Sequence, residues 1–521
     1  MKQIDKLIII TCLLLFAANT KADIYNSMKT FNSALLCLDS RYVDTVNVDA
    51  LTETAIKAML KELDPHSTYL SPKEVEQMNE GLGGSFEGIG VRYQMENDTL
   101  LVINTVTGGP SEKVGILAGD RIIMVGDSTI AGQKFNTNEI QRRLRGPKGS
   151  VVDLGIMRQG ERELLWFKVE RDKIPVYSID ASYMAAPEIG YIRLSRFAQT
   201  TPEEFDKAMG KLDEQGMKHL IVDLQDNGGG YLNSAVELAD FLLPSSELVV
   251  YTEGRSDGKR NYLTRHLFDH FKGRVVVLIN EQSASASEIL AGCLQDLDRG
   301  VIVGRRSFGK GLVQSPVRMP NGGMIRLTIS HYYTPSGRCI QKPYTKGDQK
   351  SYNEDLLNRF KQGELQSADS IDFADSLKCF TRNGRVVYGG GGIMPDYFVP
   401  LDTTIYTRYH RALQARSVVL NANLRYVDDH RRELTDAYPT FEAFKNTFEI
   451  PKSVIENVID EGEKLGIRPS NKEEKKKTLD YMKLQLKALV ARDLWGMDEY
   501  FAIMNESSPI VQAAIRLITD N

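Results

Sequence analysis

The segment 275–314 constrains the fold of this chain more than any other. Its apolar run Val275–Ile279 has the length and β-branched content of a buried strand, and a helix-forming run, Glu288–Leu297, follows after a short cluster of small residues. A second apolar run, Val301–Gly304, comes next. Because a crossover between parallel strands is right-handed and returns the second strand beside the first, the segment predicts a parallel sheet with a helix packed on it.

The turn between the first strand and the helix contains three serines in the run S-A-S-A-S, residues 283–287. Backbone N–H groups at a helix N-terminus lack intrahelical acceptors and lie at the positive end of the helix dipole, so they can stabilise an oxyanion. Lys310 follows the second strand, between two glycines. A serine becomes a good nucleophile when a base removes its proton, and a buried, neutral lysine can do so. The pairing predicts a serine nucleophile with a lysine base; a helix cap followed by a surface turn is the alternative.

Composition limits the other classes of function. The chain has 521 residues and a formal net charge of −4, so it is long enough for roughly three or four domains and has no basic excess for binding nucleic acid. Glutamates precede the lysine run 475–477, which indicates a solvated helix face. Neither a metal nor another cofactor is expected, because no spacing such as H-E-x-x-H occurs. His331 is the alternative to lysine as the base, although a strand histidine is more often a packed residue.

The first residues have the pattern of an export signal. Lys2 and Lys6 precede the apolar run Leu7–Ala18, which is short for a membrane span, and small residues follow up to Ala22. We interpret residues 1–22 as a signal peptide that directs the chain across the inner membrane to the periplasm. An uncleaved leader would leave the protein tethered to the membrane. The remaining cysteines are even in number, but their pairing cannot be read from sequence.

Periodicity divides the rest of the chain into four parts. Helix formers with apolar spacing near 3.6 dominate 25–61, and short β-rich runs with one helix, 136–144, fill 86–169. From 183 to 399 strands alternate with helices, which indicates a layered α/β region, and beyond 403 the chain is polar and helical. We therefore expect a signal peptide, a helical segment, a β module, an α/β domain and a second helical segment at 1–22, 23–80, 81–172, 173–402 and 403–521.

Several motifs in combination are specific. D-L-Q-D-N-G-G-G begins at Asp223, S-A-S-A-S-E-I at Ser283, F-G-K-G-L-V-Q at Phe308 and Y-Y-T-P-S-G-R-C-I-Q at Tyr332. Together they resemble the carboxy-terminal processing peptidases, also called tail-specific proteases. F-E-G-I-G-V and G-I-L-A-G-D-R-I-I in the β module resemble the PDZ domain of that family. The resemblance covers roughly residues 30–400 and implies a multidomain α+β fold. In it, a PDZ-like β module is inserted next to a crotonase/ClpP-like α/β serine protease core, with helical N- and C-terminal segments.

The resemblance also assigns catalytic roles. It makes Ser285 the nucleophile and Lys310 the general base, with Gln314 orienting the lysine. The flanking serines, 283 and 287, are expected to cap and pack. The backbone N–H of Ala286 would form the oxyanion hole with that of Gly229 or Gly230. Residue 228 is glycine where the family commonly has proline, so the choice between the glycines stays open.

The PDZ-like module predicts how a substrate is recognised. A peptide that adds to a sheet edge can have its terminal carboxylate held by loop amides, here those of Gly88, Ile89 and Gly90. Ile89, Ile140 and Leu144 are expected to form an apolar pocket for the last side chain. The expected partners are therefore protein or peptide substrates with free apolar C-termini.

Arg145, at the end of the helix 136–144, is expected to lie beside that groove and to couple ligand binding to the protease; a solvated turn arginine is the alternative. The helical segment 403–521 is expected to provide a homodimer or adaptor contact. Two other functions compete with a serine endopeptidase. Intact Ser285 and Lys310 argue against a catalytically silent tail-binding adaptor, and the leader and the PDZ-like module argue against a crotonase-like acyl-CoA enzyme.

Overall fold

The computed structural model describes residues 23–96, 98–106, 108–158, 160–265, 270–402, 404 and 406–520. Contacts divide the chain into two compact units. The first consists of the residues up to Ser71 with Pro316–Leu327 and Tyr344–Tyr352, and the second contains the remainder. The expected signal peptide, 1–22, lies outside the described residues.

The first unit is mainly helical. A helix covers 23–41, and α2 (Val48–Lys61) begins after Asn47, whose side-chain oxygen accepts a hydrogen bond from the N–H of Ala50 at 3.0 Å. The apolar periodicity of 25–61 thus belongs to two helices rather than one. The short strand β1 (Thr68–Leu70) pairs antiparallel with the first residues of β18 (Met324–Tyr333).

The second unit begins with α3 (Pro72–Gly83), which leads into the PDZ-like module. The module's antiparallel sheet has the order β3-β4-β5-β7-β8, and its helix α5 begins with a capping box in which Asn136 and Glu139 bond each other's backbone N–H groups. Alternate strand residues and the apolar side of α5 enclose one hydrophobic core. The elements are β2 (Ser85–Gly88), β3 (Val91–Glu96), β4 (Thr99–Thr105), α4 (Pro110–Lys113), β5 (Arg121–Val125), β6 (Ser128–Thr129), α5 (Thr137–Leu144), β7 (Val151–Met157), β8 (Leu165–Glu170) and β9 (Asp172–Pro175).

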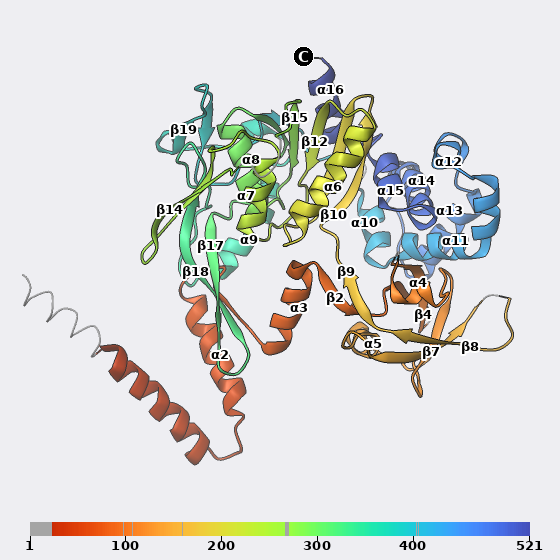
Figure 1. Ribbon diagram of the computed structural model, residues 1–521, viewed down its shortest axis with the longest axis horizontal. Coiled ribbons are helices and arrows are strands. Elements are labelled where there is room, and N and C mark those ends of the chain that lie inside the picture. Colours follow the sequence, from red (N-terminus) through yellow and green to blue (C-terminus); the bar gives the residue numbers. More distant parts are fainter. Residues whose placement is uncertain are drawn as a thin grey trace, which may run out of the picture. The chain divides into compact units, whose positions relative to one another are not determined.

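A six-stranded sheet of order β10-β11-β12-β15-β16-β21 forms the centre of the α/β region, and every neighbouring pair but β10–β11 is parallel. The predicted strand–helix–strand unit is confirmed, since β15 and β16 are parallel neighbours joined by α8. Helices α6, α7 and α8 cover one face and α16 the other, so all five residues of β15 are buried (Figure 1). These elements are β10 (Ile179–Ala186), β11 (Ile189–Leu194), α6 (Thr201–Glu214), β12 (His219–Asp223), α7 (Leu232–Asp240), β15 (Val275–Ile279), α8 (Ala286–Asp296), β16 (Gly300–Gly304), β21 (Tyr397–Phe398) and α16 (Pro509–Thr519).

The remaining strands of this region are inserted between strands of this sheet in the sequence: β13 and β14 come before β15, and β17 to β20 come before β21. Helices α10 to α16 follow β21. The last residues of β18 pair with β13, which forms a hairpin with β14. No helix among the described residues is both long and apolar enough to cross a membrane. The elements are β13 (Leu248–Gly254), β14 (Gly258–Leu263), β17 (Leu312–Arg318), α9 (Gln349–Lys361), β19 (Lys378–Phe380), β20 (Val386–Tyr388), α10 (Arg408–Ala415), α11 (Val418–Ala437), α12 (Phe441–Thr447), α13 (Lys452–Lys464), α14 (Lys472–Leu494) and α15 (Met497–Met504).

Candidate active site

The turn before α8 presents one serine and buries the other two. Ser285 is the N-cap of α8, with φ 58° and ψ −114°, a backbone conformation that costs a non-glycine residue free energy and is often found at functional sites. Ser283 and Ser287 are fully buried, and their hydroxyls donate to the carbonyls of Leu224 at 2.8 Å and Asn227 at 2.9 Å. Ser285 is the only one of the three that is partly exposed. The three serines therefore have the environments expected of one nucleophile and two packing residues.

A buried carboxylate, Glu288, joins this turn to the lysine loop. Its Oε2 accepts hydrogen bonds from the backbone N–H groups of Ser285 and Lys310, both at 2.8 Å. Its Oε1 accepts from the N–H of Gly309 at 2.7 Å and the hydroxyl of Ser307 at 2.5 Å. Burial raises the pKa of Glu288, and the four hydrogen bonds oppose that rise. Because Ser285 and Lys310 donate to the same oxygen, their backbone nitrogens lie within twice that hydrogen-bond length of each other.

The lysine loop is held on both sides. Lys310 Nζ donates to Gln314 Oε1 at 3.3 Å, and Gln314 lies on β17, so the four-residue spacing spans extended chain rather than a helical turn. The N–H of Gly311 donates to Gln341 Oε1 at 2.8 Å. A Cβ at Gly311 would lie 2.7 Å from the Gln341 nitrogen, and Gly309 has φ 88°. Both glycines thus allow close packing that other residues would disturb.

The glycine loop after β12 contacts the nucleophile turn directly. Gly229 has φ 96°, and a Cβ on it would lie 2.8 Å from the Cβ of Ser285. Its N–H is already engaged, donating to Asn227 Oδ1 at 2.9 Å. Within the described part of the chain, the N–H groups of Ala286 and Gly230 have no protein acceptor. These two amides, rather than that of Gly229, are free to bind an oxyanion.

Sequence reasoning missed two residues of this site. Glu288 is the only charged residue in the run 286–294, and a lone carboxylate on an otherwise apolar helix could have identified it. Tyr332, which is buried, donates its hydroxyl to the carbonyl of Ser285 at 3.2 Å, and nothing in the periodicity indicated this contact. Since side chains alternate along a strand, the preceding His331 points to the other face of β18 and is exposed. His331 is therefore not brought to Ser285.

The structure brings the three expected pocket residues of the PDZ-like module together but leaves no opening among them. Ile89, Ile140 and Leu144 belong to one core cluster and are at most 3% exposed. None of them lines the open cavity nearby. Gly88 ends β2, and Gly90 has φ 73°, which suits a sharp loop between β2 and β3.

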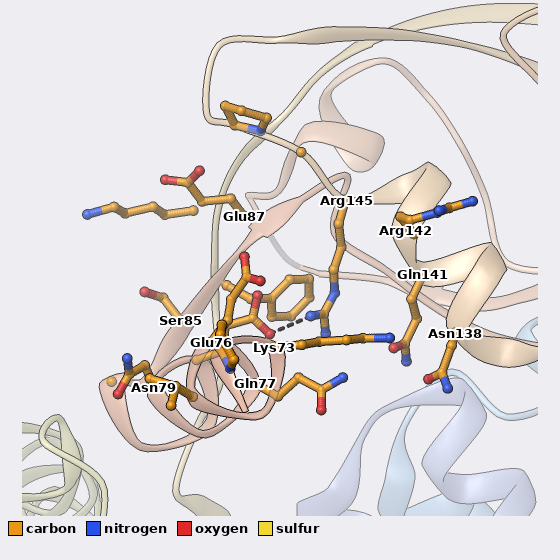
Figure 2. Close-up of a pocket in the computed structure, with 18 of the residues that line it drawn as sticks. Lys73, Glu76, Gln77, Asn79, Ser85, Glu87, Asn138, Gln141, Arg142 and Arg145 are labelled. Atoms are coloured by element: carbon orange, nitrogen blue, oxygen red, sulfur yellow. Dashed lines mark hydrogen bonds and ion pairs between the residues drawn. The ribbon is translucent and has the colours of Figure 1, made fainter. Parts of the chain in front are cut away.

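That cavity, of about 1310 Å³, is lined by α3, α5 and the adjoining loops. Figure 2 shows side chains of both helices around it, including Lys73 and Glu76 from α3 and Gln141 from α5. Arg145 lines this cavity and forms an ion pair with Glu80, and its guanidinium lies 4.7 Å from the ring centre of Phe86. Polar and charged side chains thus make up much of the lining, and the Arg145–Glu80 pair links the end of α5 to α3.

The chain is similar to known proteins along most of its length. Residues 188–351 match peptidase family S41, residues 88–179 the PDZ domain, and residues 409–496 a family of unknown function, DUF8443. It is 37% identical to the carboxy-terminal-processing protease of Bartonella bacilliformis, over 62% of this chain and 74% of that protein. It is 34% identical to the carboxy-terminal processing protease CtpB of Bacillus subtilis, over 66% and 71% respectively. Among solved structures, the photosystem II D1 C-terminal processing protease is 25% identical, with a TM-score of 0.36 and coverage of 71% of this chain and 92% of that one.

Proposed function

The chain belongs to the PDZ-containing carboxy-terminal processing peptidases, serine peptidases of family S41, and on that premise we propose that Ser285 and Lys310 carry out its catalysis. One observation supports this assignment above the others: a single buried oxygen, Glu288 Oε2, accepts hydrogen bonds from the backbone N–H of both residues. Ser285 lies at a strained helix N-terminus, which suits a nucleophile, and Lys310 lies in a loop between two glycines, which suits a base.

In the proposed reaction, neutral Lys310 Nζ takes the proton of the Ser285 hydroxyl as Oγ attacks the scissile carbonyl. The tetrahedral intermediate collapses to an acyl-enzyme, and the lysine returns the proton to the leaving amine. Water, deprotonated by the same lysine, then attacks the ester, and the lysine passes that proton to Ser285 Oγ as the carboxylate product leaves. Gln314, which accepts a hydrogen bond from Nζ, would hold the lysine in position.

The oxyanion of the intermediate is proposed to bind the N–H groups of Ala286 and Gly230. The first lies at the N-terminus of α8, where the helix dipole favours negative charge. The second is preferred to that of Gly229, whose N–H is engaged by Asn227. The role proposed for Gly229 is to leave room for Ser285, because a Cβ at residue 229 would clash with that side chain.

Substrates are proposed to be proteins with free apolar C-termini, held by the loop amides of Gly88, Ile89 and Gly90. The PDZ match over 88–179 supports a peptide site in this module. Ile89, Ile140 and Leu144 would receive the last side chain, which requires these covered side chains to part. Arg145, at the edge of the open cavity, would transmit the binding of a peptide in the PDZ domain to α3 through its ion pair with Glu80.

The proposed location is the periplasm, reached with the signal peptide 1–22, and an uncleaved leader would tether the protein to the inner membrane. The pattern of that segment supports the proposal. The helical segment 403–521 is also proposed to offer a homodimer or adaptor contact, on the strength of its length and composition. The proposed domains are the signal peptide 1–22, the helical segment 23–80, the PDZ domain 81–172, the peptidase domain 173–402 and the helical segment 403–521.

A fluorophosphonate probe tests the catalytic assignment, because it labels an activated serine covalently. Labelling of the wild-type chain should be lost in Ser285→Ala and strongly slowed in Lys310→Ala. Ser287→Ala is the matched control, since its hydroxyl is engaged by a backbone carbonyl and should not be the labelled group. Labelling that persists in Ser285→Ala would overturn the proposal.

A further inference from the structure

Strand β4 of the PDZ domain is buried on both faces. Its sequence, T-L-L-V-I-N-T, lacks the alternation of a strand with one solvated face. Leu100 and Val102 belong to the core of the PDZ domain, while Leu101 and Ile103 point away from it and are nonetheless only 2% and 8% exposed. Another part of the chain must cover these two side chains.

Helix α11 of the C-terminal segment provides that cover. Leu424 packs on Leu101 and Ile103, and all three side chains are at most 8% exposed. One turn earlier on the same face of α11, Asn421 accepts a hydrogen bond from Gln94 Nε2 at 2.5 Å. The contact therefore resembles a packed core with a polar edge rather than a loose touch of two surfaces.

Asp428, one turn after Leu424, fixes the other edge of the contact. Its Oδ2 lies 3.1 Å from Arg121 Nη2, on the strand next to β4, and its side chain is 14% exposed. Its Oδ1 would lie 2.6 Å from a Cβ at Gly119, in the loop before β5. Gly119 has φ 91°, so both its backbone conformation and its lack of a side chain suit this close approach.

The C-terminal end of the same helical segment contacts the catalytic sheet. Inside the helical segment, Asn423 of α11 donates to Asp493 Oδ2 of α14 at 2.7 Å. Asp498 of α15 accepts from the N–H of Ser182 on β10 and from Lys211 Nζ on α6, both at 2.7 Å. Apolar residues of α16 then pack on the face of the sheet opposite α8. Contacts thus connect the PDZ domain to the catalytic sheet through the C-terminal segment, with apolar packing at both ends and hydrogen bonds between them.

We propose that the C-terminal segment, including the 409–496 match of unknown function, is an intramolecular bracket that holds the PDZ domain in one orientation to the catalytic sheet. Moving the PDZ domain would expose Leu101, Ile103 and Leu424 to water and break the Arg121–Asp428 ion pair. A C-terminus bound to the PDZ domain would then keep one orientation relative to the catalytic sheet. This inference goes beyond the proposed function and does not depend on the chain's catalysis.

Spin labels on the full-length protein measure the orientation directly. Labels are attached to Lys168→Cys, on exposed β8, and Lys272→Cys, exposed in the catalytic domain, with Cys37, Cys339 and Cys379 replaced by serine. Dipolar spectroscopy should give one narrow distance. Asp428→Arg, Arg121→Asp and Leu424→Asp should each abolish that single narrow distance. The charge-swapped double variant Arg121→Asp with Asp428→Arg should restore it.

Lys476→Glu, which reverses a charge on the exposed side of α14, is the matched control and should leave the narrow distance unchanged. The charge swap keeps the proposal falsifiable even if Leu424→Asp fails to fold. A broad distribution in the parent protein, or a narrow one that survives both single charge reversals, would overturn the bracket. Because the measurement needs no turnover, it gives its answer even if Ser285 is not the nucleophile.

Discussion

The junction around Glu288 and the groove between α3 and α5 are built in opposite ways. At the junction, one buried carboxylate accepts four hydrogen bonds from the two loops that carry Ser285 and Lys310. At the groove, charged side chains surround an open cavity of about 1310 Å³, and the apolar residues expected to read a C-terminus are covered. The two loops that carry the proposed dyad are thus held together before substrate binds, whereas the proposed pocket for a C-terminus would have to open on binding.

Physical chemistry gives the two regions different sensitivities. Removing an acceptor from a buried site leaves its donors without partners, at a cost of about 1–3 kcal/mol for each. A partly exposed ion pair such as Arg145–Glu80 contributes at most about 1 kcal/mol. Substitutions at the junction should therefore change activity by orders of magnitude, and substitutions at the groove by smaller factors.

The largest effect is expected at the dyad. Ser285→Ala and Lys310→Ala should each lower kcat by roughly four orders of magnitude, and the double variant should lose no more, because the two residues act as one unit. Residual turnover in steady-state assays measures this, with unchanged circular dichroism as the control. Wild-type activity should rise with pH as the base loses its proton. Full activity in Lys310→Ala, or a loss of activity on replacing His331, would contradict the proposed mechanism.

Glu288→Gln should have the next largest effect. The substitution preserves volume but places an amide group where Oε1 or Oε2 accepts backbone donors, so at least one donor loses its acceptor. We expect kcat to fall roughly ten- to a hundredfold, consistent with about 1–3 kcal/mol for an unsatisfied donor. KM should change little, because the residue is buried away from substrate. Asp240→Asn is the control, because it makes the same exchange at a buried carboxylate that accepts a backbone N–H, that of Arg265, away from the junction. Equal losses in both variants would argue against a special role for the junction.

Blocking the substrate's C-terminus should have an effect of intermediate size. An amidated tail lacks the charge that the amides of 88–90 would hold, and a terminal aspartate would bring an unpaired carboxylate into an apolar pocket. Either change should lower kcat/KM by roughly five- to a hundredfold relative to a free aliphatic tail. Competition between matched peptide substrates measures the ratio. Equal cleavage of free and amidated tails would show that the PDZ domain does not select substrates by their C-terminus.

Arg145→Ala should have a smaller effect, because its ion pair with Glu80 is partly exposed. We expect a loss of up to about fivefold in peptide affinity and in turnover, the range of a partly exposed pair. Arg162→Ala, exposed before β8 and outside the lining of the cavity, is the control and should change neither quantity. If Arg145→Ala leaves both unchanged, the coupling role is wrong and Arg145 is a solvated turn residue.

Gly228→Pro should have the smallest effect. A Cβ at Gly228 meets no atom within 4 Å, so there is room for the proline that is common in the family. If the backbone suits the ring, the free energy of unfolding should rise by about 0.4–1 kcal/mol with turnover nearly unchanged. Thermal unfolding and kcat measure both. A loss of turnover by orders of magnitude would show that the missing N–H of residue 228 belongs to the oxyanion hole.

Much of the fold could be predicted because it follows from local spacing. The apolar run 275–279, the small residues after it and the helix formers from Glu288 define a strand, a turn and a helix wherever they occur, and the structure has β15 and α8 there. The family resemblance of the motifs at Ser283 and Phe308 selected Ser285 and Lys310. The β-rich runs of 86–169 predicted the strands of the PDZ domain, but not that β4 is covered on both faces.

Partners distant in the sequence account for what could not be predicted. Glu288 finds its donors in the loop 307–310, Tyr332 reaches Ser285 from β18, and Leu424 covers β4 from the C-terminal segment. Periodicity shows which side of an element is apolar but does not identify what packs against that side. The residue types, their spacing and, through the family resemblance, the proposed dyad came from the sequence alone. Only the tertiary structure decided that Gly229 has its N–H engaged, that Ile89 is covered and that one buried carboxylate joins both catalytic loops, because burial and hydrogen-bond partners exist only once distant segments have packed together.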